Sequence, residues 1–451
     1  MTPLELNSGD TAWILSASAL VLLMTPGLAL FYGGMVRGKS VLNMMMMSFA
    51  ALAIVPVLWV LFGYSMAFGD DVGGGLLGNP FQALGLKGLM ADTSSTYPAL
   101  AFVAFQAVFA IITVALISGA IADRAKFSTW MIFVAIWATV VYFPIAHWVF
   151  DFSTDSGHVG GWMANQLKVI DFAGGTAVHI NAGAAGLALA LVLGKRIGFK
   201  TEAMRPHNLT LVMLGAGLLW FGWFGFNAGS ALSAGNTASV TWVNTMVATA
   251  AASLGWLFTE RIRDGHFTSL GAASGVVAGL VAITPACSSL SPVGSIILGL
   301  VAGVLCSLAV GLKYKLGFDD SLDVVGVHLI GGLVGTIGVG FLATAAAPAA
   351  VDGLFYGGGF HQLWRQAVGA LAVMVVSFVL TYIIGFILHK TIGFRVREDD
   401  ERTGVDEVVH AESGYDLLGG RLSIAGGSLA AGSSRKASAA EPSAITEEVG
   451  A

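Results

Sequence analysis

Two histidines lie inside stretches of sequence that are otherwise apolar and rich in glycine. The first, His179, belongs to DFAGGTAVHINAGAAG, which runs from Asp171 to Gly186. The second, His328, belongs to DVVGVHLIGGLVG, which runs from Asp323 to Gly335. A neutral imidazole both donates and accepts hydrogen bonds and changes charge near neutral pH, so two linked rings can pass a proton or a small hydrogen-bonding solute. The alternative is that each ring bonds only to groups of its own surroundings and has a purely structural role.

An aspartate opens each of these two stretches. A carboxylate at the start of a helix caps free backbone N–H groups and complements the positive end of the helix dipole. We therefore predict a capping role for Asp171 and Asp323. Direct binding of a cation is the alternative for Asp171.

A second set of candidate residues consists of aromatic rings at helical spacing. Phe105 and Phe109 are four residues apart, and so are Phe226 and Ser230 in the segment WFGFNAGS, which starts at Trp223. Residues four apart share one face of a helix. Ring faces attract small cations, a hydroxyl accepts an N–H group, and an apolar constriction can gate a pore by excluding water. Core packing is the alternative for the phenylalanine pairs, and we assign Trp223 a structural role.

The composition places these residues in a membrane. Of the 451 residues, 56% are hydrophobic and only 11% are charged, whereas about a quarter are charged in ordinary soluble domains. Ionisable groups are costly at membrane depth, so buried aspartate and histidine indicate a pathway or a ligand. The two cysteines, Cys287 and Cys306, are too few for a disulfide framework. We expect no metal, cofactor, enzymatic domain or nucleic-acid partner.

Apolar stretches of about 20 residues, which is the length that crosses a bilayer, recur along the chain. We predict an all-α polytopic membrane protein with eleven transmembrane helices, at about 11–34, 40–67, 98–122, 128–150, 171–194, 208–232, 238–259, 268–284, 292–312, 323–345 and 363–389. Spans one to five and six to ten form two sets of equal, odd number, so the second set would be inverted. Such repeats place the substrate site at their interface, and the fifth and tenth spans carry the two histidines.

Basic residues predict the orientation. Twelve Lys and Arg residues fall in the loops after the odd-numbered spans before the tail, and three fall on the other side. The positive-inside rule then puts residues 1–10 outside the cell, a transmembrane domain at 11–389, and a cytoplasmic regulatory segment at 390–416. The composition of the Gly-, Ser- and Ala-rich remainder, 417–451, predicts a low-complexity, disordered tail.

Several long segments follow one another along the chain and include FYGGMVRGKSVLNM, GAIADRAKFS, PIAHWVF, DFAGGTAVHINAGAAGLALALVLGKR, GWFGFNAGSA, TPAC and GVHLIGG. In sequence and in order, these segments resemble the ammonium transporter (Amt/Mep/Rh) family, specifically its bacterial Amt branch. The resemblance covers residues 11–416. It implies an eleven-helix protomer with an outward N-terminus, in the plasma (inner) membrane, assembled as a homotrimer with one pore in each protomer.

The resemblance also implies roles for individual residues. An outer recruitment site for ammonium would be formed by Phe105, Phe150 and Ser230 with support from Asp171, a gate by Phe109 and Phe226, and the pore by His179 and His328. One departure concerns Phe150, three residues after His147, where family members often have tryptophan. A phenyl ring attracts a cation less strongly than indole does, and Trp148 should face elsewhere on its helix.

The resemblance therefore predicts an ammonium transporter in which ammonium is recruited, loses its proton, and crosses as ammonia between the histidines. The tail segment VREDDERTGVDEVVHAESGYD resembles the family's regulatory tail, which implies a PII-type regulatory partner. An ammonium sensor that signals through this tail is the main alternative. Two others are a neutral-gas channel of the Rh type and an electron-transfer protein with His179 and His328 as haem ligands.

Overall fold

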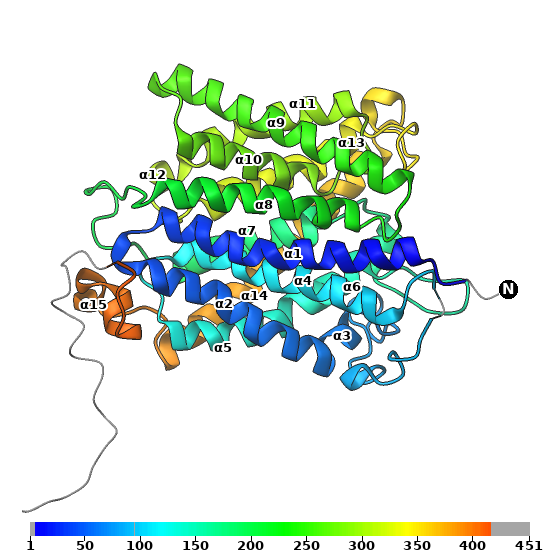
Figure 1. Cartoon of the computed structure of the whole chain (residues 1–451), viewed down its shortest axis with the longest axis horizontal. Helices are drawn as coiled ribbons and strands as arrows, with labels where there is room; N and C mark the ends of the chain where they lie inside the picture. The colour runs from blue at the N-terminus through cyan, green and yellow to red at the C-terminus, as the bar shows by residue number, and fades with distance from the viewer. Residues whose placement is uncertain (1–4, 94, 416–451) are drawn as a thin grey trace, which may run out of the picture. The chain divides into compact units, whose positions relative to one another are not determined.

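The computed structural model describes residues 5–93 and 95–415, and these residues fold into helices without a named strand. The predicted tail at 417–451 lies outside the described residues. Figure 1 shows the long helices running side by side, with α1 against α8 and α9 against both α10 and α11.

Nine helical segments of the described chain are long and apolar enough to cross a membrane. Five of them combine an α-helix with one or more short turns of π- or 3₁₀-helix, and the chain stays helical through the change. The nine segments consist of α1 (Ser8–Met35), η1–α2–η2–α3 (Gly38–Ser40, Val41–Leu58, Trp59–Gly63, Tyr64–Phe68), α4–η4 (Ala99–Ile117, Ser118–Ile121), α5–η5–α6 (Phe127–Trp137, Ala138–Tyr142, Phe143–Phe150), η7–α7 (Gly175–Ile180, Asn181–Leu193), α8 (Leu209–Gly229), α11–α12 (Pro292–Ala309, Leu312–Leu316), η8–α13 (Val325–Leu329, Ile330–Leu342) and α14 (His361–Thr391).

The two remaining expected spans, 238–259 and 268–284, also fall on helices. They correspond to α9 (Asn236–Asp264), which is long but less apolar, and to α10 (Ser269–Ile283), which has only 15 residues. A helix of that length is about 22 Å long, shorter than the roughly 30 Å hydrocarbon core. The count of eleven spans therefore stays a prediction. The other short elements are η3 (Leu84–Leu86), η6 (Met163–Leu167), η9 (Leu354–Tyr356), α15 (Glu398–Thr403) and η10 (Asp406–His410).

The two histidine-bearing spans are built alike. Each begins with a wide π-type turn, η7 or η8, that contains the histidine and leads into an α-helix, α7 or α13. A glycine follows each histidine by four residues, Gly183 after His179 and Gly332 after His328. A Cβ atom at Gly183 would lie 2.4 Å from the backbone nitrogen of Leu329, and one at Gly332 would lie 3.0 Å from the carbonyl oxygen of Gly175. Each glycine thus lets the other half's backbone approach closely.

Candidate functional site

The two predicted histidines meet in the interior of the bundle. Both side chains are buried, with residue exposures of 1% for His179 and 3% for His328. Their Nδ1 atoms lie 3.3 Å apart, and the ring planes differ by 22°. Two nitrogens at this distance form a hydrogen bond only if one carries the proton and the other accepts it. The pair is therefore linked through one shared proton position.

One face of the histidine pair is covered by an indole. The Trp223 ring of α8 stacks on His179 at 5.3 Å between centroids, and its Nε1 donates a 2.8 Å hydrogen bond to Thr284 Oγ1. Trp223 was assigned a structural role from the sequence, and the hydrogen bond to Thr284 does fix its ring. Its stacking on His179 also makes it part of the wall beside the pair.

The predicted phenylalanines form a continuous series of rings beside the histidines. Phe226 lies 6.1 Å from His179 and stacks on Phe109 at 4.2 Å with 25° between the planes. Phe109 in turn contacts Phe105 at 4.9 Å and the edge of Phe150 at 6.4 Å. The structure thus brings together rings from α4, α6 and α8. Neighbouring rings in this series have centroids no more than 6.4 Å apart.

Ser230 ends the helix that carries Phe226. Its hydroxyl donates a 2.8 Å hydrogen bond to the carbonyl oxygen of Phe226, and the residue is partly exposed. The hydroxyl oxygen keeps lone pairs that can accept a further N–H group. The role of Ser230 in cation recruitment therefore stays a prediction.

A narrow cavity lies against the histidine pair. Its lining comes from α1, α4, α8 and α10 together with His179 and His328, and apart from the imidazoles and the Trp223 indole it is aliphatic or phenyl. The free space is about 10 Å³, and a single water molecule requires roughly 10–15 Å³ by this measure. The cavity therefore has room for about one small molecule the size of water and none for the hydration shell of an ion.

Both carboxylate oxygens of Asp171 accept hydrogen bonds from residues at the start of η7. Its Oδ1 accepts from the backbone N–H groups of Gly174 and Gly175 at 2.9 and 2.5 Å. Its Oδ2 accepts from the N–H groups of Thr176 and Ala177 at 2.8 and 3.1 Å, and from the Thr176 hydroxyl. This is a capping interaction, as the sequence predicted. It holds the turn that carries His179.

The predicted cap at Asp323 is wrong, because Asp320 caps η8 instead. The two Asp320 oxygens accept from the N–H groups of Val324 and Val325 at 3.0 and 2.7 Å. Asp323 has a φ of 63° and turns its carboxylate to the buried Lys313, whose Nζ lies 2.6 Å from Oδ1. Asp320 precedes His328 by eight residues, the same spacing as between Asp171 and His179. That equal spacing was the signal in the sequence that could have identified Asp320.

Comparison with known proteins shows the family to which the chain belongs. The family model described as Ammonium Transporter Family matches residues 12–415. The chain belongs to the ammonium transporter family. An ammonium transporter of Mycobacterium tuberculosis is 63% identical over 434 residues, which cover 91% of each chain. Two solved structures are also similar to the chain: Mep2 of Saccharomyces cerevisiae (34% identity, TM-score 0.79, covering 88% and 89% of the two chains) and a Sensor Amt Protein (29% identity, TM-score 0.82, covering 90% and 98%).

As a member of the ammonium transporter family, the chain is a multi-pass membrane protein whose named relatives are transport proteins. Among the described residues, no group of three or more His, Cys, Asp or Glu side chains is placed to hold a metal ion.

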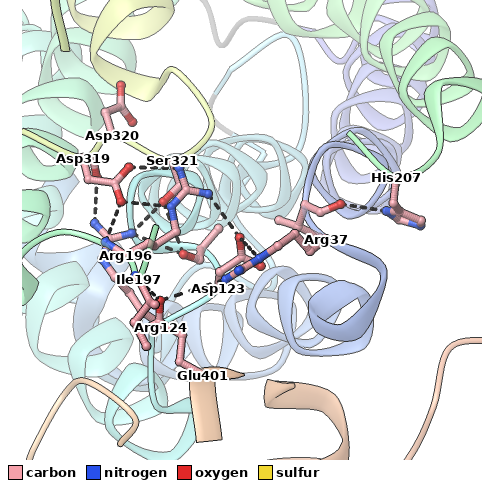
Figure 2. Close-up of polar contacts among 12 residues, drawn as sticks. Arg37, Asp123, Arg124, Arg196, Ile197, His207, Asp319, Asp320, Ser321 and Glu401 are labelled. Carbon is pink, nitrogen blue, oxygen red and sulfur yellow. Dashed lines mark hydrogen bonds and ion pairs between the residues drawn. The ribbon is translucent and has the colours of Figure 1, made fainter. Parts of the chain in front are cut away.

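A group of ion pairs lies where several inter-helix loops meet (Figure 2), and we name it the ion cluster (Arg37, Asp123, Arg196 and Asp319). Arg196 binds both oxygens of Asp319 at 2.9 Å and Asp123 at 3.1 Å. Arg37 lies 3.3 Å from the same Asp123 oxygen. Burial alone would lower the pKa of Arg196, but the two carboxylates outweigh burial and raise it above its usual value. The cluster was not singled out from the sequence, where these residues stand far apart.

The chain after α14 joins the ion cluster through Glu401. Its Oε1 accepts from the backbone N–H of Ile197 at 2.7 Å, and its Oε2 binds Arg395 at 2.8 Å. The side chain of Glu401 is fully buried. A second contact is made by Asp406, whose carboxylate accepts from the N–H groups of Leu42 and Asn43 at 2.9 and 2.7 Å. The segment thus caps the N-terminus of α2 with a residue more than 360 positions away.

Proposed function

We propose that the chain transports ammonium by recruiting the cation at an outer aromatic site, removing its proton, passing ammonia between His179 and His328, and relaying the proton across the membrane separately through the histidine pair. The observation that carries this proposal is the unbroken series of rings from Phe105 and Phe150 through Phe109 and Phe226 to the histidine pair. Rings at the entrance would favour a cation through their faces. Rings deeper in the series would exclude water.

The size and polarity of the cavity support the separation of ammonia from its proton. A charge without its hydration shell is expensive in apolar surroundings, and the cavity of about 10 Å³ admits no shell. Ammonia is neutral and donates and accepts hydrogen bonds, so an imidazole nitrogen can replace its water. The Nε2 atom of His179 is buried and has no hydrogen-bond partner among the residues described. Potassium has no proton to lose, so it would remain charged and be excluded.

The proposed transport predicts a current that depends on ammonium. Protein reconstituted into vesicles on a solid-supported membrane should give a charge displacement after an ammonium pulse and none after an equal potassium pulse, because only ammonium can shed and relay a proton. Protein-free vesicles are the control for passive ammonia flux. Equal responses to both cations would contradict the proposal. Uptake of ammonia without any current would instead favour a neutral-gas channel of the Rh type.

We also propose eleven spans in an inverted five-plus-five repeat, with an outward N-terminus and a cytoplasmic segment after residue 390. The paired arrangements Asp171 with His179 and Asp320 with His328 support the repeat, since each carboxylate caps a π-type turn that carries its histidine. The distribution of Lys and Arg supports the orientation. Assembly as a homotrimer is proposed from the family resemblance, and the mass of the intact assembly in mild detergent tests it.

The contacts of Glu401 and Asp406 favour regulation by the segment after α14. A helix loses about 0.5–2 kcal/mol when its cap is removed, so docking of Asp406 would influence α2 and the loops around it. We propose that this segment couples its position to the pore and offers a docking surface to a PII-type partner. Co-purification of a PII protein with the full chain, but not with a chain ending at residue 396, tests the partner.

The sensor alternative rests on the similarity to the structure named Sensor Amt Protein. We predict that Asp406→Asn lowers ammonium uptake severalfold at equal protein amount, because asparagine keeps only one of the two oxygens that accept from the N–H groups of α2. Asp399→Asn, on an exposed residue of the same segment, should leave uptake unchanged. Deleting residues 397–451 should also reduce uptake without abolishing it. Unchanged uptake in the deleted and Asp406 variants, combined with loss of an ammonium-dependent cellular response, would favour the sensor.

A further inference from the structure

A histidine in the loop after α6 bonds to two carboxylates from different segments. The Nδ1 atom of His158 lies 2.6 Å from Asp70 Oδ1, and its Nε2 lies 2.8 Å from Asp151 Oδ1. A carboxylate oxygen only accepts, so both nitrogens must carry protons for both bonds to form. The geometry is therefore that of an imidazolium ion held between two carboxylates, which we name the His158 clasp (His158, Asp70 and Asp151).

The clasp connects directly to the proposed outer site. Asp151 immediately follows Phe150 and ends α6. Its carbonyl oxygen accepts from the Gly161 N–H at 3.0 Å and from Asn165 Nδ2 at 2.9 Å, which closes the loop 151–161. The Phe150 ring meets the edge of Phe109 at 6.4 Å. The residue that positions the end of α6 is thus adjacent to the ring that would receive the cation.

The far side of the clasp belongs to the segment after α3. Asp70 is 52% exposed at its side chain, His158 is 23% exposed, and Asp151 is only 6% exposed. The backbone N–H of Asp71 also donates to the carbonyl oxygen of Val159 at 2.9 Å. The clasp therefore joins two loops that already lie together. Its loss should loosen the loop 151–161 without unfolding the protein.

We propose that the His158 clasp is a pH-dependent positioning device that holds Phe150 in place for cation recruitment, so that the affinity for ammonium changes with the protonation of His158. The proposal rests on the proposed outer site at Phe105, Phe150 and Ser230. In it, His158 acts through Asp151 and does not contact the substrate. The maximal transport rate, which depends on the histidine pair deeper in the protein, does not depend on the clasp.

The surrounding charges set the direction of the pH effect. Burial lowers the pKa of His158, but hydrogen bonds to Asp151 and Asp70 and their charges outweigh burial and raise it above the usual value. A raised pKa means that the clasp is fully formed below about pH 6.5 and is lost as the pH rises through the raised value. Other titratable groups also face the clasp. His147 lies 3.1 Å from Asp151 and 3.4 Å from Asp71, and Tyr64 of α3 lies within the electrostatic influence of Asp151.

The test compares His158→Gln with the wild-type protein at two pH values. Glutamine donates from one end only, so it cannot bond to both carboxylates. At about pH 6 we expect the KM for ammonium to be about fivefold higher in the variant, with the maximal rate unchanged, because a charge-assisted hydrogen bond is lost. As the pH rises through the raised pKa of His158, the imidazolium loses a proton and the wild-type clasp loses one of its two bonds, so the two KM values should converge toward high pH. His158→Arg carries a permanent charge with a forked donor, so it should keep a low KM at both pH values.

Hydrogen exchange of the peptide 151–161 tests the clasp independently of transport. At acid pH its amides should exchange several times faster in His158→Gln and in Asp70→Asn than in wild type. Asp155→Asn in the same loop and His361→Gln at the start of α14, both on exposed residues, should match wild type in exchange and KM. Unchanged exchange in His158→Gln would overturn the clasp, and faster exchange with an unchanged KM at both pH values would overturn its positioning role. Failure of the outer site itself would show separately, as an unchanged KM in Phe150→Ala.

Discussion

Replacing Asp171 with asparagine is expected to destabilise the protein more than any other single change at a helix start. Four backbone N–H groups and one hydroxyl donate to this carboxylate. An asparagine side chain accepts on one oxygen only and turns its NH₂ group toward the remaining donors. Leaving buried donors unsatisfied costs about 1–3 kcal/mol each, so two or more orphaned groups remove several kcal/mol from a marginal total of roughly 5–15 kcal/mol.

Asp320→Asn and Asp323→Asn form a matched pair for the same measurement. Asp320 caps two N–H groups with two oxygens, so its replacement should cost about 1–3 kcal/mol. Asp323→Asn keeps an oxygen for Lys313 and should cost about 1 kcal/mol or less. Thermal denaturation in detergent, followed by the fraction of protein that remains monodisperse, should rank Asp171 first, Asp320 second and Asp323 last. If Asp323→Asn were as damaging as Asp320→Asn, the reassigned cap would be wrong.

The central residues of the site could be predicted because their chemical types are unusual in apolar membrane spans. A histidine in a glycine-rich apolar span has few structural reasons to be there, and two of them at matching places indicate one shared pore. The aromatic residues Phe109 and Phe226 could be placed because helical spacing fixes the face on which a side chain lies. The structure brings these four side chains together as expected, with 4.2 Å between the phenyl rings and 3.3 Å between the imidazole nitrogens.

The parts that sequence could not predict depend on backbone conformation or on distant segments. Asp323 opens the apolar stretch that carries His328, and this position predicts a cap, but its positive φ turns its carboxylate toward Lys313 and leaves the cap to Asp320. The cap of α2 by Asp406 and the clasp of His158 join residues that are 364 and 88 positions from their partners. The spacing of residues within one helix cannot predict contacts between residues so far apart in the sequence. The number of spans stays open because α10 is too short to decide by length.

The second large effect is expected at the histidine pair. Replacing His179 and His328 together with alanine removes two rings from the wall of a cavity of about 10 Å³, so water would enter and carry ions with it. We expect the preference for ammonium over potassium to fall by at least tenfold, which corresponds to about 1.4 kcal/mol. The measurement is the ratio of ammonium to potassium currents in reconstituted vesicles. His361→Ala, on an exposed residue, is the matched control. Unchanged ammonium-specific uptake and potassium exclusion in the double alanine variant would show that the pair is not the pore.

Replacing the same two histidines with leucine separates the two things that an imidazole pair could do. Leucine roughly keeps the volume but neither donates nor accepts hydrogen bonds. If the pair relays the proton through its Nδ1–Nδ1 contact of 3.3 Å, the leucine variant should lose the ammonium-dependent current, because no acid or base remains within reach. If the pair only shapes the lumen, the current should persist at a reduced rate with potassium still excluded. The alanine variant reports on the size of the pore and the leucine variant on its proton chemistry, so together they assign the mechanism to one property or the other.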